Sequence, residues 1–583
     1  MKKQQFDTGS TPALPETYGE HNDMLIKHRD NQIEIVMNIM PYPDAIIKTA
    51  YRAGEDDAIV AIKLYTSNGA SITISIESIL GRPADLDEEL AKQRLFLTKK
   101  ALVTFNEFCR ALLNNIDSYF PNEEFIANQT GFVGQRLAFA FHDSVVQKSS
   151  GKTVILPPKV DRQIADAGKP FGDYTKYRDA VLSSDAPLIV KFVIMYALSS
   201  MLLDFVDVES GGMHFYGASG SGKTTLLRIA ASVFGRATAP DRNLRGRSYL
   251  HHFDTTSNAL DTLFPLFNNM LLGVDEIGKL SVRELSPLIY KIGSGVSKMR
   301  ANTSIELVEN EPSRYFVMTT GEVSIPQYLK QTNESNQAKG KSVRLPSIVV
   351  KPEYLQRIGC NTVNNSKEYV HNINKAITNS YGHLSRDFIN KTFDSVNDYD
   401  ELAAQVSKCF DEKFYDLTES LEPKNSIEDR WLHRLALVQI AGEMASDLDV
   451  LPWSHDQIDD AIKFIHKYWK SEDSNTMDDA EAGVKNIINF IKRNAHCFLD
   501  AENDDIWGKS DIIGYEKGNY FYILPERFER LCGTAHIDDV LRHLTLKGLI
   551  RSDKGKRVKR AELKAVGKRA YYYVLSRDVL SEI

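Results

Sequence analysis

The stretch Gly217-Ala218-Ser219-Gly220-Ser221-Gly222-Lys223-Thr224 follows an apolar run at 213–216 and precedes a helical pattern that begins at Thr225. Its spacing is that of a phosphate-binding loop, because glycines let successive backbone N–H groups face one anion at the N-terminus of a helix. In this interpretation Lys223 reaches the outer phosphates and the Thr224 hydroxyl ligates Mg²⁺. The alternative is a Gly/Ser turn with a solvated lysine, but the strand and helix predicted on its two sides favour the nucleotide site.

An acidic motif occurs further along the chain, where the apolar run at 270–274 ends in Asp275 and Glu276. A buried parallel strand has this composition, and ligands collect at the carboxyl ends of such strands. We expect Asp275 to hold the magnesium shell and Glu276 to polarise the attacking water as a general base. The alternative is a strand that ends in an ordinary acidic turn. Together the motifs predict hydrolysis of ATP or GTP, with ATP and Mg²⁺ held by Gly217, Ser219, Gly220, Ser221, Gly222, Lys223, Thr224, Thr225 and Asp275.

Length and composition indicate a soluble protein with several domains. With 583 residues the chain is too long for one core, so about three or four domains are expected. Its 42% apolar and 26% charged residues are typical of globular proteins. The net charge of −7 argues against wholesale coating of nucleic acid, so any such contact must come from local patches.

Cysteines and apolar runs predict a cytoplasmic protein without zinc or membrane contact. The five cysteines form no C-x-x-C pair, which suggests a reducing compartment. The polar N-terminus predicts no signal peptide. The most apolar segment, 192–203, falls short of the roughly twenty residues of a membrane span and is expected to be a buried helix.

The N-terminal part is predicted to be a flexible tail, 1–30, followed by an α+β recognition or assembly domain, 31–205, for which a purely structural role is the alternative. Short β-like runs occur at 33–36, 58–65 and 71–76, with the hairpin turn Asn68-Gly69 between the last two. Helical periodicity extends from 87 to about 120. A second sheet is expected from the runs at 131–133, 137–141 and 154–156.

The core predicted at 206–355 contains further strands and two helices, at 281–292 and 325–331. The runs 304–308 and 315–320 are expected to form a hairpin whose second arm is a core strand. A polar residue at the tip of that strand contacts the terminal phosphate in ATPases of this build, which suits Thr320 or Thr319. The alternative is that both threonines reflect β propensity alone.

An arginine is expected to complete each nucleotide site from a neighbouring subunit. Arg344 precedes the last core strand, where ring-forming ATPases keep a finger that stabilises transition-state charge. An ordinary surface arginine is the alternative, and Arg300 and Arg314 are further candidates.

Four blocks of this core resemble the helicase-like ATPase family known as domain of unknown function 927. They are 217–235, 272–278, 318–322 and 343–345, within a resemblance expected over about 130–355. Phe253 and Ser313 stand near places where that family usually has tryptophan. The family occurs in bacteria, phages and mobile elements, often near replication modules, so the resemblance implies a helicase-like motor in the cytoplasm of a bacterial host cell.

The C-terminal part is expected to be a helical domain, 366–475, an acidic linker, 471–479, and a winged-helix domain, 480–583. A helix predicted at 537–546 precedes a basic loop and the strand 571–575. Basic residues of that loop, Lys556, Arg557, Lys559 and Arg560, are expected to neutralise nucleic-acid phosphates. A solvated hairpin or a wing used for protein contact is the alternative.

The sequence therefore predicts a multidomain α/β protein with an ASCE-type, RecA/AAA+-like, P-loop ATPase core. We expect an ATP-dependent, ring-forming nucleic-acid motor, a DNA helicase-like replication protein of a phage or mobile element. It would form a homo-oligomer, such as a hexameric ring, on single-stranded or forked DNA, with replication or defence proteins as further partners. Lys298 and Arg300 would then line a central channel. The alternatives are an NTP-gated switch or scaffold, for example in antiphage defence, and a DNA packaging or transfer ATPase.

Overall fold

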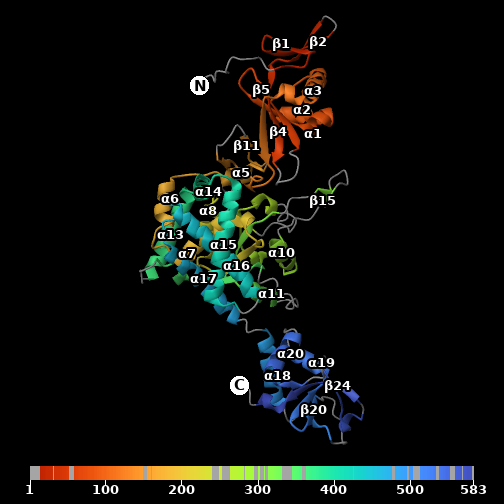
Figure 1. Ribbon diagram of the computed structural model, residues 1–583, viewed down its shortest axis with the longest axis vertical. Helices are drawn as coiled ribbons and strands as arrows, with labels where there is room; N and C mark the ends of the chain where they lie inside the picture. Colours follow the sequence, from red (N-terminus) through yellow and green to blue (C-terminus); the bar gives the residue numbers. More distant parts are fainter. Residues whose placement is uncertain are drawn as a thin grey trace.

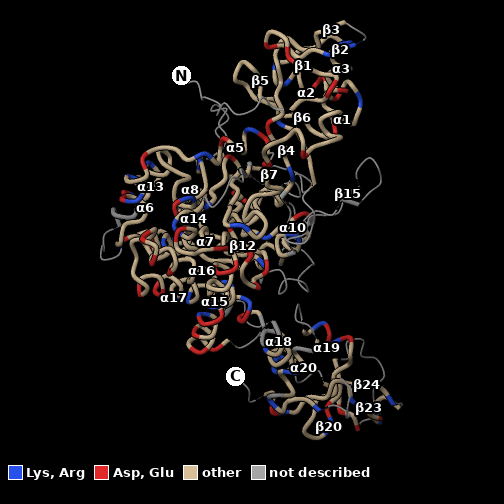
Figure 2. Tube along the Cα trace, turned by 45° about the horizontal axis from the view of Figure 1, so that its top comes forward, with Lys and Arg blue, Asp and Glu red and all other residues tan. Residues whose placement is uncertain are grey.

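The computed structural model arranges the chain as three bodies along one long axis, with the N-terminal body at one end and the C-terminal body at the other (Figure 1). Basic and acidic residues are interspersed over all three (Figure 2). The structure describes residues 13–29, 32–50, 58–148, 154–158, 160–238, 248–252, 263–280, 282–294, 300–301, 307–308, 313–330, 344–357, 363–423, 426–475, 479–494, 498–502, 513–532, 537–551, 558–567 and 569–580.

The N-terminal body contains two sheets and a group of helices. Strands β1 (Tyr18–His21), β2 (Met24–Arg29) and β3 (Gln32–Met37) form an antiparallel sheet. A second sheet has the order β11-β7-β4-β5-β6. Its strands are β4 (Pro41–Ala50), β5 (Ile59–Thr66), β6 (Ser71–Ser75), β7 (Asn122–Ala127) and β11 (Val154–Leu156). The predicted hairpin turn is confirmed: β5 pairs with β6, and Gly69 has a φ of 85° between them.

The helices of this body are α1 (Ile76–Leu80), α2 (Pro83–Lys92), α3 (Lys99–Leu113) and α4 (Ile116–Tyr119). The helical periodicity expected from 87 to about 120 is therefore confirmed, but it is divided among three helices. The chain turns at Arg94, with a φ of 63°, and the Thr98 hydroxyl caps α3 by accepting from the Ala101 N–H. Local capping thus divides a continuous apolar periodicity into separate helices.

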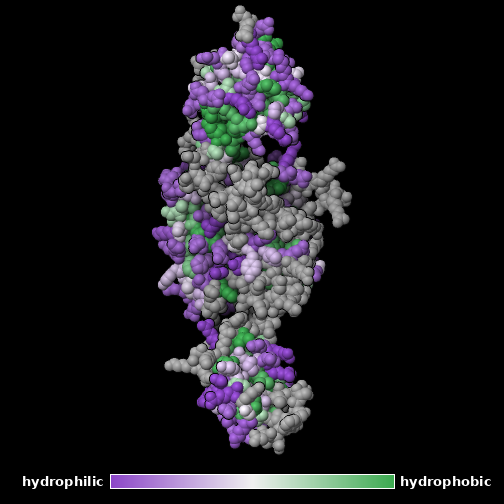
Figure 3. All heavy atoms as spheres, turned by 90° about the vertical axis from the view of Figure 1, so that its right-hand side faces the viewer, coloured by the Kyte–Doolittle hydropathy of each residue, from purple (hydrophilic) through white to green (hydrophobic). Residues whose placement is uncertain are grey.

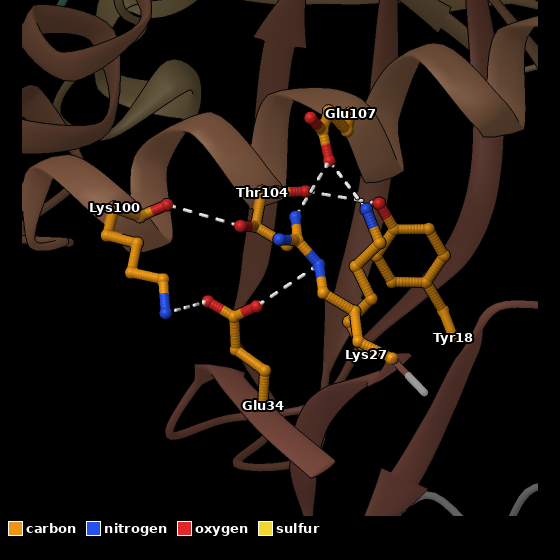
Figure 4. A network of polar contacts seen from close by, with 7 residues as sticks. Tyr18, Lys27, Glu34, Lys100, Thr104 and Glu107 are labelled. Atoms are coloured by element: carbon orange, nitrogen blue, oxygen red, sulfur yellow. Dashed lines mark hydrogen bonds and ion pairs between the residues drawn. The ribbon is translucent and has the colours of Figure 1, made fainter. Parts of the chain in front are cut away.

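A polar network fastens α3 to the three-stranded sheet (Figure 4). Glu107 accepts from Lys27 at 2.6 Å, and Glu34 pairs with Lys100 at 3.0 Å. Ile33 and Ile35 of β3 are more than half exposed, and Figure 3 shows apolar patches on the surface of the N-terminal body.

A short sheet joins the N-terminal body to the centre. Strands β8 (Gly131–Phe132), β9 (Ala138–Ala140) and β10 (Val145–Gln147) pair in the order β10-β9-β8. The prediction that 154–156 closes this sheet is wrong, because β11 pairs in parallel with β7 instead. Phe132, Phe139 and Phe141 belong to the hydrophobic cluster of the central body, whereas Ala138 and Ala140 pack with Phe125 of β7.

The central body is built on a parallel sheet with the order β13-β14-β17-β12-β18. Its strands are β12 (Gly211–Tyr216), β13 (Leu250–His252), β14 (Leu271–Asp275), β17 (Phe316–Gly321) and β18 (Ser347–Val349). All residues of β12, β14 and β17 are buried, as expected for strands covered on both faces. Because the strands are parallel, their carboxyl ends lie along one edge of the sheet.

Helices α8 (Lys223–Ser232), α10 (Val282–Ser294) and α11 (Ile325–Lys330) surround this sheet. The helix α7 (Leu188–Ser199) packs against α8, and its Tyr196 ring stacks on Phe316 of β17 at 4.9 Å. The stretch Leu188–Phe205 has a mean hydropathy of 1.9 and is apolar and long enough to cross a membrane, but 89% of it is buried inside the protein. It is thus a core helix, as expected for the segment 192–203.

The predicted hairpin between 304–308 and 315–320 is wrong. Strand β16 (Leu307–Val308) pairs with β15 (Arg300–Ala301), whereas β17 lies between β12 and β14. The polar segment between the two runs suggested a tight turn. The buried apolar run of β17 instead fits the interior of a parallel sheet.

A set of long helices packs beside the sheet, as predicted for 366–475. They are α13 (Val363–Asn379), α14 (Leu384–Ser395), α15 (Tyr399–Leu421), α16 (Ser426–Asp447) and α17 (His455–Asn475). Trp431 of α16 stacks on Trp469 of α17 at 5.0 Å. The linker expected at 471–479 is mostly helix, because α17 continues to Asn475 and the segment contains neither glycine nor proline to stop it.

The C-terminal body has its own hydrophobic cluster. Its helices are α18 (Asp479–Asn494), α19 (Pro525–Leu531) and α20 (Ile537–Leu546). They accompany a sheet of the order β19-β20-β21-β24-β22, in which β23 also pairs with β24. Its strands are β19 (Leu499–Asp500), β20 (Gly514–Lys517), β21 (Tyr520–Ile523), β22 (Ile550–Arg551), β23 (Lys559–Glu562) and β24 (Arg569–Ser576).

Candidate active site

The loop 217–222 leaves the carboxyl end of β12 and leads directly into α8. Gly222 is the N-cap of α8 with a φ of 102°, a left-handed conformation that side chains disfavour. A Cβ at Gly222 would lie 2.0 Å from Leu355 Cδ1, and one at Gly217 would lie 2.5 Å from the Val350 carbonyl oxygen. The loop can therefore pack against the chain that follows β18 only because these residues are glycines.

The side chain of Lys223 lies back over the same loop. Its Nζ donates to the carbonyl oxygens of Gly217 at 2.7 Å and Ala218 at 2.8 Å. Burial lowers the pKa of Lys223 from its ordinary value, while the nearby Glu322 and Asp275 carboxylates act in the opposite direction. The ammonium group is thus held beside the backbone amides that a phosphate group would approach.

Two acids lie at the end of β14, as the sequence predicted. Asp275 is 6% exposed, and its Oδ1 accepts a hydrogen bond from the Thr320 hydroxyl. The backbone N–H of Glu276 donates to Thr320 Oγ1 at 3.0 Å. Glu276 adopts φ 58° and ψ 62°, an uncommon conformation for a residue with a side chain, and its side chain is exposed. Asp275 therefore lies inside the protein, whereas Glu276 faces the solvent.

Lys223, Glu276 and Thr320 line one cavity of about 410 Å³. It brings together residues expected from both motifs and from the tip of β17. Its lining residues are Ser219, Gly220, Lys223, Thr224, Glu276, Gly278, Thr320, Gly321, Glu322, Val323 and Tyr328.

The two adjacent threonines of β17 have different partners. Thr320 reaches Asp275, whereas the Thr319 hydroxyl lies 2.9 Å from Nδ1 of His214, on β12. Successive side chains of a strand point to opposite faces, so only one of the two can face the acids. Thr320 is therefore the threonine of the candidate site.

The remaining residues predicted to hold the nucleotide lie in or beside the loop. Ser221 is buried, and its hydroxyl has no hydrogen-bond partner among the described residues. The Thr225 hydroxyl accepts from Asn374 Nδ2 of α13 at 3.4 Å. A buried hydroxyl without a partner is costly in the interior and is available to an anion in the loop.

Two of the candidate finger arginines, Arg344 and Arg314, are not among the residues that line this cavity in their own chain. The Arg344 guanidinium lies over the Tyr290 ring of α10 at 5.1 Å, and the Arg344 carbonyl adjoins Gly211, at the amino end of β12. Arg314 donates to the carbonyl oxygens of Val206 and Val208, both at 2.7 Å. A role of Arg344 across a subunit boundary stays a prediction.

Part of the predicted nucleic-acid surface lies within the described chain. Arg560 and Lys559 are on β23, and the Arg560 guanidinium lies 5.9 Å from the ring of Tyr571, which is 47% exposed. Arg300 starts β15. Lys298, Lys556 and Arg557 lie outside the described residues.

Sequence reasoning missed three contributors to the site: Glu322, Tyr328 and His214. Glu322 lies in a block already quoted for the family resemblance, so its position after Thr320 was the available signal. The Tyr328 hydroxyl donates to the Leu280 carbonyl, which ties α11 to the chain after β14. His214 had no signal, because a histidine within an apolar run is most often an ordinary core residue.

Comparison with known proteins adds three findings. Residues 56–309 match the family model "Domain of unknown function (DUF927)", so the match begins earlier and ends earlier than expected. No curated protein matches the chain. A solved structure titled "SCCmec type IV Cch - active helicase" matches with a TM-score of 0.67 and 16% identity, over 97% of this chain and 99% of its own.

At 16% identity this likeness shows a shared fold. The blocks 217–235 and 272–278 lie inside the matched region, and the other two blocks follow it. The resemblance drawn from those blocks is confirmed, because residues 56–309 match the model of that family.

Proposed function

We propose that this protein hydrolyses ATP and uses the reaction to move along or separate nucleic-acid strands. The observation that carries the proposal is the convergence of Lys223, Glu276 and Thr320 on one cavity at the carboxyl edge of a parallel sheet. An ammonium group, a run of loop amides and an acid pair are the groups that phosphoryl transfer to water requires.

The strand order supports an ASCE-type core. Strand β17 lies between the loop strand β12 and the acid strand β14, so the tip of β17 adjoins both motifs. Thr320, at that tip, can then contact the nucleotide and the acid pair at the same time. We also infer a winged helix in 480–583, because α20 precedes the paired strands β23 and β24. The domain limits are proposed to lie near 205, 355 and 480.

The donor set fits Mg²⁺, which prefers oxygen ligands and is usually held by one or two protein groups beside phosphates. Thr224 would supply a hydroxyl and Asp275 a carboxylate, and both lie at the carboxyl edge of the sheet. The metal would neutralise charge on the phosphates when bound.

The residues of this chain have distinct proposed roles. Lys223 would bind the outer phosphates, since its Nζ already lies against the loop. Glu276 would accept a proton from the attacking water, and its exposed side chain lines the cavity. Thr320 would fix the positions of Asp275 and Glu276 through the two hydrogen bonds of its hydroxyl.

Nucleic acid is the proposed substrate of the motor, on two grounds. The solved structure that shares the fold is titled an active helicase. The C-terminal body presents Lys559 and Arg560 next to exposed Tyr571, a combination that suits phosphates and bases. We further propose a ring of subunits, hexameric in size, with Arg344 acting across the boundary and Lys298 and Arg300 facing a central channel.

The test measures ATP hydrolysis with and without single-stranded DNA, and then strand separation on a forked duplex. We expect DNA-stimulated hydrolysis with unwinding, lost in Lys223→Ala and kept in Lys408→Ala, an exposed lysine of α15. Hydrolysis indifferent to DNA would favour an NTP-gated switch. Equal hydrolysis by Lys223→Ala and the parent protein would overturn the proposal.

A further inference from the structure

His214 lies in the middle of β12, two residues before the strand ends, and is completely buried. In the parallel pairing of β12 with β17, it stands opposite Thr319. Its Nδ1 lies 2.9 Å from Thr319 Oγ1, and its Nε2 lies 3.0 Å from the Val323 carbonyl oxygen. One ring therefore joins the strand before the phosphate loop to the tip of β17 and to the segment beyond it.

The partners decide which ring nitrogen carries the proton. A carbonyl oxygen only accepts, so Nε2 must carry the hydrogen and donate to Val323. Nδ1 of the neutral ring is then an acceptor, and the Thr319 hydroxyl donates to it. Both polar atoms of the ring are used, and each contact has one direction.

The ring also lies directly against the wall of the cavity. A Cβ placed on Gly321 would be 2.7 Å from Cε1 and 3.0 Å from Nε2 of His214. Gly321, Glu322 and Val323 line the cavity together with Thr320. His214 thus contacts the first residue of this wall and hydrogen-bonds the last, while Glu322 between them faces the cavity.

The far side of the same segment is fastened by the neighbouring strand. The N–H of Ile325, at the start of α11, donates to Ser347 Oγ on β18 at 3.0 Å. Ser347 is the residue that pairs with His214 on the other side of β12. His214 and Ser347, which are paired neighbours in the sheet, therefore both hydrogen-bond the segment between β17 and α11.

We propose that His214 is a positioning residue for the hydrolysis assigned above: it fixes the wall 321–323 relative to the pair Thr320 and Asp275, so that Glu322 faces the nucleotide. The inference rests on the proposed function. His214 touches neither the cavity nor the reacting groups, and acts through the backbone of the wall.

The test compares His214→Phe, which keeps a ring without polar atoms, with His214→Gln, whose amide can still donate to Val323. Thr319→Val and Thr319→Ser form the matched pair for the other contact. The measurements are kcat, KM, the stoichiometry of ATP binding, and hydrogen exchange of the amides at 321–325 in the absence of nucleotide.

We expect His214→Phe and Thr319→Val to lower kcat at least about tenfold, with KM changed less than about threefold, because the phosphate loop is intact. Exchange at 321–325 rises while ATP still binds at one per chain, and His214→Gln and Thr319→Ser recover most of both losses. A general loss of folding would instead lower the binding stoichiometry. If His214→Phe does not fold, the Thr319 pair gives the same decision.

Unchanged kcat and unchanged exchange in His214→Phe and Thr319→Val would overturn the role of His214 and leave ATP hydrolysis standing. A parent protein that hydrolyses no more ATP than Lys223→Ala would overturn the proposed function itself, and the role of His214 with it. The two failures are therefore distinguishable in one set of assays.

Discussion

The Thr320 hydroxyl donates a hydrogen bond to the carboxylate of Asp275, which joins the tips of β17 and β14 inside the protein. The same oxygen accepts from the backbone N–H of Glu276. The Thr320 hydroxyl thereby fixes the carboxylate of Asp275 and the backbone of Glu276 at the same time. The acid pair is held by a strand that neither motif contains.

Thr320→Val should lower kcat for ATP hydrolysis by about 100-fold, because the valine keeps the shape but removes both hydrogen bonds that place the acids. Thr320→Ser keeps the hydroxyl and should stay within about tenfold of the parent protein. Steady-state hydrolysis assays of the two variants check this prediction. Equal kcat values for Val and Ser would show that the hydroxyl is unimportant.

Glu276→Gln should separate binding from chemistry. The amide cannot accept the proton of the attacking water, so we expect kcat to fall by about 10² to 10⁴. ATP binding should persist, since Lys223 and the loop are unchanged. Fluorescent-nucleotide titration beside the hydrolysis assay measures both quantities. Loss of binding to the same extent as in Lys223→Ala would contradict the proposed role of Glu276.

Two buried histidines should make the free energy of unfolding fall in mild acid. Burial lowers the pKa of His142 and of His214 to about 4, against about 6.5 in an unfolded chain. Between these values the unfolded state binds more protons, so stability is complete above pH 6.5 and declines as the pH falls towards 4. The loss is about 3 kcal/mol for each histidine.

Denaturant unfolding of the central body at pH 7.5, 6 and 5 measures this decline. His142 donates from Nε2 to the Leu266 carbonyl at 2.6 Å, so His142→Phe should lower stability at pH 7.5 and flatten the pH dependence. An equally steep dependence in that variant would assign the effect to other groups.

The largely buried ion pair of Asp143 and Arg386 should be costly to break. The two side chains are 8% and 12% exposed, and Arg386 also donates to the carbonyl oxygens of Gly168 and Gly382. Asp143→Ala leaves a buried guanidinium without its counter-charge, so we expect a loss of about 3 to 5 kcal/mol. Glu562→Ala breaks the exposed pair with Arg569 and should cost less than about 1 kcal/mol.

The double variant Lys559→Ala/Arg560→Ala should weaken binding to single-stranded DNA without regard to sequence. Two lost phosphate contacts should reduce the slope of log K against log salt by about 1.4. Fluorescence anisotropy over a salt series measures this slope. Lys92→Ala/Lys408→Ala, which removes the same charge from exposed helices, should leave the slope unchanged.

Much of the site could be predicted from the sequence because its chemistry lies in contiguous segments. The loop 217–224 and the acids at 275–276 each carry their own spacing, and parallel strands bring their ends together. The choice between Thr319 and Thr320 could not be made from the sequence, because both residues are threonine. Which of them reaches the acids depends on which face of β17 lies towards Asp275.

The errors concern pairings between segments that are distant or locally ambiguous. The run at 304–308 was expected to pair with β17, but its strand β16 pairs with β15 instead. Strand β11 pairs in parallel with β7, and such a pairing has no turn motif in the sequence that would predict it. His214 was missed for the same reason: its importance comes from Val323, more than a hundred residues away in sequence, and a local pattern contains no such information.

The close succession of α17 and α18 restricts how far the C-terminal body can travel. Asn475 ends one helix and Asp479 begins the next, so the connecting chain spans at most about 14 Å even when fully stretched. A connection this short keeps the start of α18 close to the end of α17 in the same subunit and raises the local concentration of the C-terminal body there. If subunits assemble, each C-terminal body would therefore stay joined closely to the helices of the subunit that carries it.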